Sequence, residues 1–357
     1  MHKLYFSYLF IKYSKSLLIV LLGLTFTVTS IDYLDNASKI VGEGNQKILY
    51  AYYTWQYMLV EFYPLAIVFA TTMTYLSLVK NNLMVSLFSF GYTKRVLFIP
   101  IFIPAFLLYI SMQILQLGEF AYGKEKAVSI LHHTTTNRAV NNLFFKYNNS
   151  FVYAKRLDPI KRVLYEVTIF GVDKDRVMDA TTIASVEYAG EYWVGKDAIQ
   201  MTKHYLVDGT PNGFSTTILH DIQILHGYKP KVIEMIYEGE SLSLSDAIAT
   251  YRLLYRQNLD LTKIKSSIYN KSILPLFAFA VMVFIFFKTP YHSRYIKMDI
   301  VWAISLGGSI LIWGLFYALY VLSKSAIVSP DFAMLLPIVI LLGYSLFLYI
   351  GDKQKQI

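Results

Sequence analysis

The feature that most constrains this chain is a set of long apolar stretches without charged residues. A membrane-spanning helix needs about 20 such residues, within a range of about 17–25. The third, fifth and sixth stretches reach that length alone, and flanking lysines and tyrosines can extend the shorter ones. We therefore expect six transmembrane helices, over Ser16–Ile31, Phe62–Val79, Val96–Leu117, Ser272–Phe287, Ile300–Leu322 and Phe332–Ile350.

Composition supports the same class of protein. Hydrophobic residues make up 55% of the 357 positions and charged residues 16%, whereas soluble domains carry about 25% charged residues. The 30 Tyr and 24 Phe suit membrane interfaces and lipid contact. Cysteine is absent, which excludes disulfides, cysteine-ligated zinc, iron–sulfur clusters and a cysteine nucleophile.

Basic residues indicate how the helices are oriented, because short cytoplasmic loops are enriched in Lys and Arg. One set of alternating segments carries eleven of them, and the other short loops carry three. The basic set comprises residues 1–15, 80–95, 288–299 and the tail with Lys353 and Lys355. We therefore expect both termini in the cytoplasm and residues 118–271 outside. The distribution of basic residues among the loops explains the net charge of +9, so we expect no nucleic-acid partner.

The first apolar stretch could also belong to a signal peptide, since Lys3, Lys12 and Lys15 precede it. A signal peptide ends in a cleavage site of the A-x-A kind. Residues 29–32 read Thr-Ser-Ile-Asp and do not form one. We therefore expect an uncleaved first helix.

Residues 143–240 show the period of two that half-buried strands have. Residues 163–170 and 183–188 alternate between two faces, and Asn212-Gly213 marks a turn. Several short strands predict a sandwich, a jelly roll or an open barrel. A filled core and an apolar ligand groove both fit this pattern, and a filled core is the simpler interpretation. Residues 243–268 then turn helical, with Ser243 or Ser245 as the cap.

No catalytic constellation is recognisable in the sequence. Gly118–Lys124 matches the first seven positions of a P-loop, but the next residue is Glu125, so the Ser or Thr that binds Mg²⁺ is missing. Neighbours such as His132 and His133 point apart on a helix or strand and make no metal site alone. We assign no catalytic residue, no metal ligand and no cofactor. A membrane enzyme for lipid-linked substrates remains an alternative that clustered acids or histidines would favour.

The segment 80–95 can form a short amphipathic helix. Its apolar residues recur at helical spacing and form one stripe, made of Leu83, Met84, Leu87, Phe88 and Gly91. Asn82 lies off this stripe, at the start of the segment. Such a helix docks in the groove of a partner protein or lies on the lipid surface, and the pattern alone leaves both possibilities open.

The chain resembles the LptF/LptG (YjgP/YjgQ) permeases of lipopolysaccharide export over nearly its full length, and within that family it looks most like the LptG member. The strand segment opens with the family pattern N-x-F-V-Y, and the fourth stretch begins with aromatic-x-K-x-x-x-P-L. The residues that carry the resemblance are Gly118–Phe120, Asn149–Tyr153, Tyr165–Phe170 and Tyr269–Leu276.

This resemblance implies a fold and a function. The fold is an α-helical membrane protein with six transmembrane helices (3+3) and an inserted periplasmic β-jellyroll domain. The boundaries are 1–117 for the N-terminal membrane half, 118–268 for the domain with its connecting helices, and 269–357 for the C-terminal half. The function is to extract lipopolysaccharide from the inner membrane of a Gram-negative bacterium and pass it to the periplasmic bridge. An LptF-like paralogue and a mechanotransmission permease that carries no lipid are the alternatives.

The resemblance also implies partners. An LptF-like permease completes a heterodimer, an LptB-like ATPase dimer hydrolyses ATP, and an LptC-like periplasmic or membrane subunit is a further partner, so the chain itself is no enzyme. The segment matching Asn81–Gly91 is the family's coupling helix, which sits on the ATPase. The coupling residues are then Asn82, Leu83, Met84, Leu87, Phe88 and Gly91.

Two departures from the family pattern affect the expected contacts. Leu83 stands where family members commonly carry an acidic residue, so one charged contact with the ATPase is in doubt. Near the outer end of the first helix, Asp32 and Ser38 replace basic residues that hold lipopolysaccharide phosphates, and Lys39 keeps its charge. We expect Lys39 to contact a phosphate, with Lys324 as a second candidate; a solvated loop lysine is the competing interpretation.

Overall fold

The fold was analysed in a computed structural model of the whole chain. His132, His133, Lys353 and Lys355 lie outside the residues that the structure describes. The described residues are 2–40, 44–131, 140–148, 150–158, 161–173, 176–205, 210–230, 232–233, 242–256, 260–291 and 297–351.

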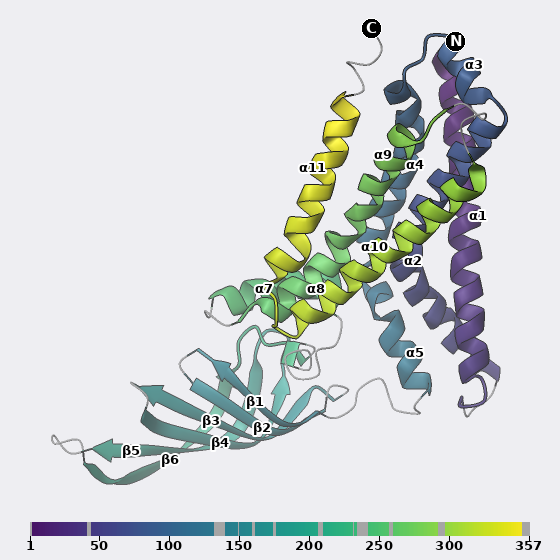
Figure 1. The fold of residues 1–357 in the computed structure, drawn as a ribbon. Coiled ribbons are helices and arrows are strands. Elements are labelled where there is room, and N and C mark those ends of the chain that lie inside the picture. The colour runs from purple at the N-terminus through teal and green to yellow at the C-terminus, as the bar shows by residue number, and fades with distance from the viewer. Residues whose placement is uncertain are drawn as a thin grey trace. The chain divides into compact units, whose positions relative to one another are not determined.

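The chain divides into two compact units. The membrane unit comprises Met1–Leu131, Ser243–Ile248 and Leu261–Ile357, and the β unit comprises His132–Leu242 and Ala249–Asp260. Six helical segments among the described residues are long and apolar enough to cross a membrane, and the β unit holds a six-stranded antiparallel sheet (Figure 1). The predicted class, six membrane helices with an inserted β domain, is therefore confirmed.

Several membrane helices extend beyond the charge-free stretches, because a helix continues through polar residues at both membrane surfaces. The N-terminal three spans are α1, α2 and α4, and the short helix α3 lies between α2 and α4 (Figure 1). The elements are α1 (His2–Asn36), α2 (Gly44–Lys80), α3 (Leu83–Ser89), α4 (Lys94–Leu115), η1 (Glu119–Tyr122) and α5 (Gly123–Leu131).

The C-terminal three spans include two interrupted helices. The fourth span, 262–288, consists of α8 and α9 joined by the short turn η2. The sixth begins with one π-helical turn, η4, before α11. The elements are α8 (Thr262–Ser272), η2 (Leu274–Leu276), α9 (Phe277–Lys288), α10 (Met298–Lys324), η4 (Asp331–Leu335) and α11 (Leu336–Gly351).

The core of the membrane unit surrounds α2. Of the 18 most apolar consecutive residues of each helix, 78% are buried inside the protein in α2 and 11% in α10. Leu9 and Tyr13 of α1, Phe98 of α4 and Phe286 of α9 join the cluster that α2 centres. The Tyr13 hydroxyl donates to the Ile67 carbonyl at 3.2 Å, so the buried phenol is hydrogen-bonded where water is excluded.

The β unit contains a sheet whose strands pair in chain order, β1 to β6, all antiparallel. β1 and β6 are therefore its edge strands. Asn212 and Gly213, which the sequence predicts in a turn, lie inside β6, where Gly213 adopts a left-handed φ of 95°. The strands are β1 (Val140–Tyr147), β2 (Ser150–Asp158), β3 (Val163–Asp173), β4 (Arg176–Tyr188), β5 (Trp193–Tyr205) and β6 (Pro211–Ile224).

One row of irregular positions crosses this sheet. Asn142, Glu166 and Asp221 have left-handed φ values of 56°, 49° and 50°, a conformation that is uncommon outside glycine. The registers of the strand pairs skip these residues: Leu143 pairs with Ala154 and Asn141 with Arg156, which leaves Asn142 unpaired between them. The register is the same on both sides of these positions, so the row interrupts the pairing of the strands without inserting a residue.

The inner face of the sheet forms the core of the β unit. Trp193 is fully buried, and its indole N–H donates to the Tyr228 carbonyl at 2.6 Å. Leu164 and Val186 lie on one side of the irregular row, Ala154 and Ile183 lie on the other, and all belong to one buried cluster. A filled core therefore covers this part of the sheet, but the described strands form one sheet and not the two of a sandwich.

Helix α7 (Leu244–Arg256) begins at a cap that the sequence predicts correctly. The Ser243 hydroxyl accepts from the Asp246 backbone N–H at 3.2 Å and donates to its carboxylate at 2.9 Å. The Tyr122 hydroxyl accepts from the Ser243 N–H at 3.1 Å and donates to the same carboxylate at 2.7 Å. These bonds tie η1 to the start of α7 within the membrane unit.

This cap predicts a pH dependence. Burial, reinforced by the Asp246 carboxylate, raises the pKa of Tyr122 to about 12, above the unfolded value of about 10. The stability from the neutral phenol is therefore fully present below about pH 10 and is lost as pH rises toward about 12. Tyr122→Phe should unfold more easily at pH 8, by about 1 kcal/mol. The gap between wild-type and variant thermal midpoints should close between about pH 10 and 12; a gap that stays constant contradicts the assignment.

Candidate functional site

Helix α3 forms where the sequence predicts an amphipathic helix. It begins after Asn82, which has a left-handed φ of 53°, and it ends before Gly91, which has φ 83°. Two left-handed residues at its ends reverse the chain sharply between α2 and α4. Figure 1 shows α3 at the end of the membrane unit where α1 begins and α11 ends.

The apolar stripe of α3 faces the protein itself. Met84 is 0% exposed, and Leu83, Leu87 and Phe88 pack against the same cluster as the membrane helices. The Phe88 ring also meets Tyr291 edge-on, with centroids 4.8 Å apart. Met84 therefore fixes α3 to the helix bundle, since that is where its apolar surface leaves water. The other members of the predicted stripe are half-buried or, at Gly91, exposed, so their contact with an ATPase stays a prediction.

The exposed face of α3 is therefore mostly polar, with one aromatic residue. Asn82, Ser86, Ser89 and Gly91 are exposed, and Phe90 is 73% exposed. A contiguous surface that includes an exposed aromatic ring is typical of a protein interface. The helical pattern missed Phe90 because it lies outside the stripe, and its exposure is visible only in the structure.

The basic residues after α3 cap other helices of the membrane unit. Lys94 Nζ donates to the Phe287 carbonyl at 3.0 Å, in the last turn of α9. The Arg95 guanidinium donates to the Ile350 carbonyl of α11 and lies over the Tyr349 ring, 5.2 Å from its centroid. Cations stabilise the C-terminal ends of helices. The first turn of α4, which follows α3, is thus bonded to both α9 and α11.

The two lysines expected to contact phosphate lie on different helices, at the opposite end from α3. Lys39 is exposed in the turn after α1, and its Nζ donates to Asn36 Oδ1 at 3.0 Å. Lys324 is the half-buried last residue of α10. Figure 1 shows this end of α10 beside α8 and well apart from the end of α1, so the chain by itself does not bring the two lysines together.

The P-loop-like segment has a packing role. Gly123 begins α5 and lies against α2 so closely that an added Cβ would stand 2.9 Å from the Tyr53 carbonyl oxygen and 3.0 Å from Gln56 Cβ. Lys124 lies over the Tyr57 ring, 5.0 Å from its centroid. The motif serves close helix packing, in agreement with the missing Mg²⁺ ligand.

Gly123→Val is therefore expected to loosen α5 from α2. A side chain forced into a packed contact costs about 1–3 kcal/mol, and the change should appear as a lower thermal midpoint and faster proteolysis within α5. Gly118→Val is the matched control, since nothing lies within 4 Å of an added Cβ there. Equal midpoints for the two variants would argue against the close contact.

Large apolar side chains cover the outward faces of α1, α10 and α11. Examples are Ile19 of α1, Leu311 of α10 and Phe347 of α11, each more than half exposed. Lipid tails or the apolar face of another membrane protein suit such surfaces. These three helices are the ones with the smallest buried share among the six spans.

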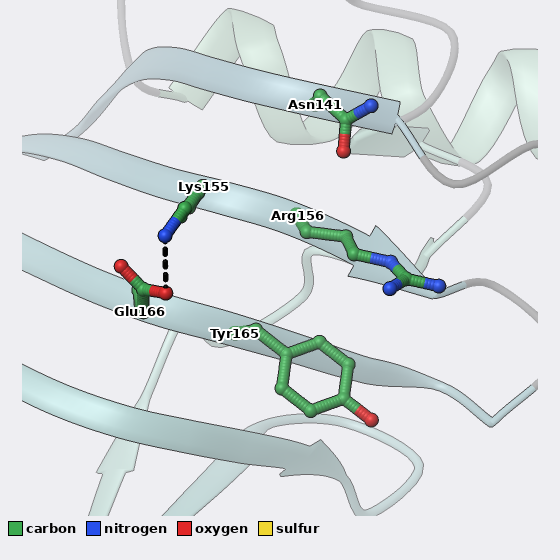
Figure 2. A pocket seen from close by; sticks show the side chains of 5 residues that line it. All are labelled: Asn141, Lys155, Arg156, Tyr165 and Glu166. Atoms are coloured by element: carbon green, nitrogen blue, oxygen red, sulfur yellow. Dashed lines mark hydrogen bonds and ion pairs between the residues drawn. The ribbon is translucent and has the colours of Figure 1, made fainter.

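A pocket of about 330 Å³ opens on the β unit beside the irregular row (Figure 2). Lys155 Nζ and Glu166 Oε1 lie 2.6 Å apart, and this hydrogen bond and its charge raise the pKa of Lys155. Arg156 lies over the Tyr165 ring, 5.9 Å from its centroid, and Asn141 completes the lining. Because Glu166 neutralises Lys155, Arg156 supplies the net positive charge, and the pocket suits an anionic or sugar group.

Among the described residues, no group of three or more His, Asp or Glu side chains is placed to hold a metal ion. No curated protein sequence matches the chain. The family model described as "Lipopolysaccharide export system permease LptF/LptG" matches residues 7–351, which is nearly the whole chain and includes both the membrane helices and the sheet. The chain therefore belongs to the LptF/LptG family of lipopolysaccharide export permeases.

Proposed function

We propose that the chain is an LptG-like subunit of an ABC transporter in the inner membrane, with its ATPase partner bound at α3. The supporting observation is the exposed surface of Asn82, Ser86, Ser89, Phe90 and Gly91, defined here as the α3 face. Buried Met84 fixes this face between α2 and α4, as a surface that transmits force must be held. The cytoplasmic side is supported by the basic residues of the alternating segments in the sequence, of which Arg294, Lys353 and Lys355 lie outside the described residues.

The other partners would use surfaces that the structure leaves apolar or open. An LptF-like subunit would cover the outward faces of α1 and α10, and lipopolysaccharide would enter between the two subunits. An LptC-like subunit would extend the sheet at an edge strand, β1 or β6, where backbone groups are available for pairing. Lys39 and Lys324 remain proposed phosphate contacts, which lipid bound between two subunits could bridge.

Two alternatives within this proposal are an LptF-like role and a mechanotransmission role. Co-expression with candidate partners tests all three. If the complex hydrolyses ATP and carries lipopolysaccharide by mass spectrometry, the export role is supported. If the chain pairs with an LptG chain and not with an LptF chain, it is the LptF-like subunit. An active ATPase complex without lipid would favour mechanotransmission, and a chain that binds no ATPase would contradict the proposal.

A further inference from the structure

The helical hydrogen bonding of the fourth span is interrupted at two consecutive backbone carbonyls. Pro275 has no N–H, so the Lys271 carbonyl, four residues earlier, has no helical donor. The next N–H, that of Leu276, bonds to Ile273 at 3.0 Å and not to Ser272. The carbonyls of Lys271 and Ser272 are thereby released from the helix inside a membrane span, where an unpaired polar group is costly.

Helix α4 supplies a donor to each released carbonyl. The Gln113 amide Nε2 donates to the Lys271 carbonyl at 3.0 Å, and the Tyr109 hydroxyl donates to the Ser272 carbonyl at 2.8 Å. Tyr109 and Gln113 are four residues apart, on one face of α4. Two donors on one face of α4 thus satisfy the two released carbonyls, and we infer that α4 stabilises the junction between α8 and α9.

Further contacts fix the two donors and both sides of the break. Gln113 Nε2 also reaches the Tyr63 hydroxyl of α2 at 3.2 Å. The Tyr109 ring meets Phe279 in the first turn of α9 edge-on, with centroids 5.7 Å apart. Tyr109 therefore contacts α8 through its hydroxyl and α9 through its ring.

The same helix α4 is bonded to the far end of this span. Lys94, at its first position, donates to the Phe287 carbonyl near the end of α9. Only Phe90 to Thr93 separate α3 from α4. A shift of α3 thus moves a helix that holds the fourth span both at its break and at its end.

We propose that Tyr109 and Gln113 are positioning residues that fix the angle between α8 and α9, and that α4 changes this angle when α3 moves during transport. This inference rests on the proposed function in which an ATPase acts on α3. It assigns a role to Lys271 and Pro275, two residues of the family pattern at the start of the fourth span.

The angle can be measured in the full-length chain in nanodiscs. Because the chain has no cysteine, Lys263→Cys on α8 and Phe284→Cys on α9, both at exposed positions, accept spin labels without further changes. Removing both donors with Tyr109→Phe and Gln113→Leu should shift and broaden the distance distribution between the labels. Pro275→Ala restores an N–H for the Lys271 carbonyl and should narrow the distribution again in the Gln113→Leu background.

A matched control lies three residues further along the chain, at the C-cap of α4. Gln116 is fully buried, and both polar atoms of its side chain lack a partner among the described residues. Gln116→Leu therefore removes an amide of the same size without removing a bond, and should leave the distribution unchanged. A shift in this control as large as in Gln113→Leu would overturn the inference, because the effect would then follow from any buried change in α4.

The transport readout is the number of lipopolysaccharide molecules released per ATP in the reconstituted complex. We expect about a fivefold lower ratio for each hydrogen bond removed, as the net contribution of one such bond implies, with ATP hydrolysis retained. An unchanged ratio, or unchanged label distances, would overturn the inference. A wild-type complex that neither hydrolyses ATP nor releases lipid would instead contradict the proposed function. The distances between the spin labels in the chain alone would still test whether Tyr109 and Gln113 fix the angle between α8 and α9.

Discussion

Replacing Phe90 by aspartate is expected to abolish co-purification of the ATPase subunit with this chain. Phe90 is 73% exposed on the α3 face, so the change does not remove a buried contact within the chain. An aromatic anchor at the centre of an interface contributes about 2 kcal/mol or more to binding, and a buried unpaired carboxylate adds a further penalty. The dissociation constant should therefore rise at least about thirtyfold, measured by pull-down or by titration in detergent.

The control for Phe90 is a substitution of the same type at a comparably exposed position. Phe214 on β6 is 70% exposed, and Phe214→Asp should leave ATPase binding unchanged. Phe90→Ala should give an intermediate loss, since it removes the ring without adding a charge. If Phe90→Asp retains wild-type affinity, the ATPase binds elsewhere and the α3 face is not the coupling surface.

Replacing Trp193 by alanine is expected to have the largest effect on stability. The side chain is fully buried, hydrogen-bonded to the Tyr228 carbonyl, and 5.3 Å from the Tyr188 ring between centroids. Loss of a buried tryptophan costs about 3–5 kcal/mol. Amide hydrogen exchange in β4 and β5 should then become a hundredfold or more faster, while the protected amides of α2 should exchange as before.

Trp193→Phe separates packing from hydrogen bonding. Phenylalanine keeps much of the apolar volume but has no N–H, so it should cost about 1–3 kcal/mol, the penalty for leaving the Tyr228 carbonyl unpaired. Exchange that accelerates equally in both variants would assign the whole effect to that bond. Exchange in Trp193→Ala that matches wild type would show that the sheet does not depend on this core.

Hydropathy predicted the membrane helices well, for a simple reason. A span must be both apolar and long, and no tertiary contact removes that requirement. The strands of the β unit were also recognisable, because alternation directly reflects one buried face. The irregular row at Asn142, Glu166 and Asp221 was not recognisable, since left-handed conformations at Asn, Asp and Glu have no fixed sequence signal.

The α3 segment shows where a periodic pattern stops being informative. Periodicity shows that Met84 and its neighbours share one apolar face, but it does not show what covers that face. In the folded chain the cluster of membrane helices covers Met84 completely and its apolar neighbours in part, so most of the α3 face lies on the reverse side. Phe90 became a candidate only when its exposure was known.

Sequence alone determined the class of this protein: six spans, an inserted β domain and membership of a lipopolysaccharide export family. Those properties depend on composition, period and order, which are local or additive along the chain. Tertiary structure decided which side of α3 is available and which side chains satisfy the broken fourth span. Tyr109 and Gln113 lie more than 150 residues from the carbonyls they bond, and only folding brings such distant donors and acceptors together.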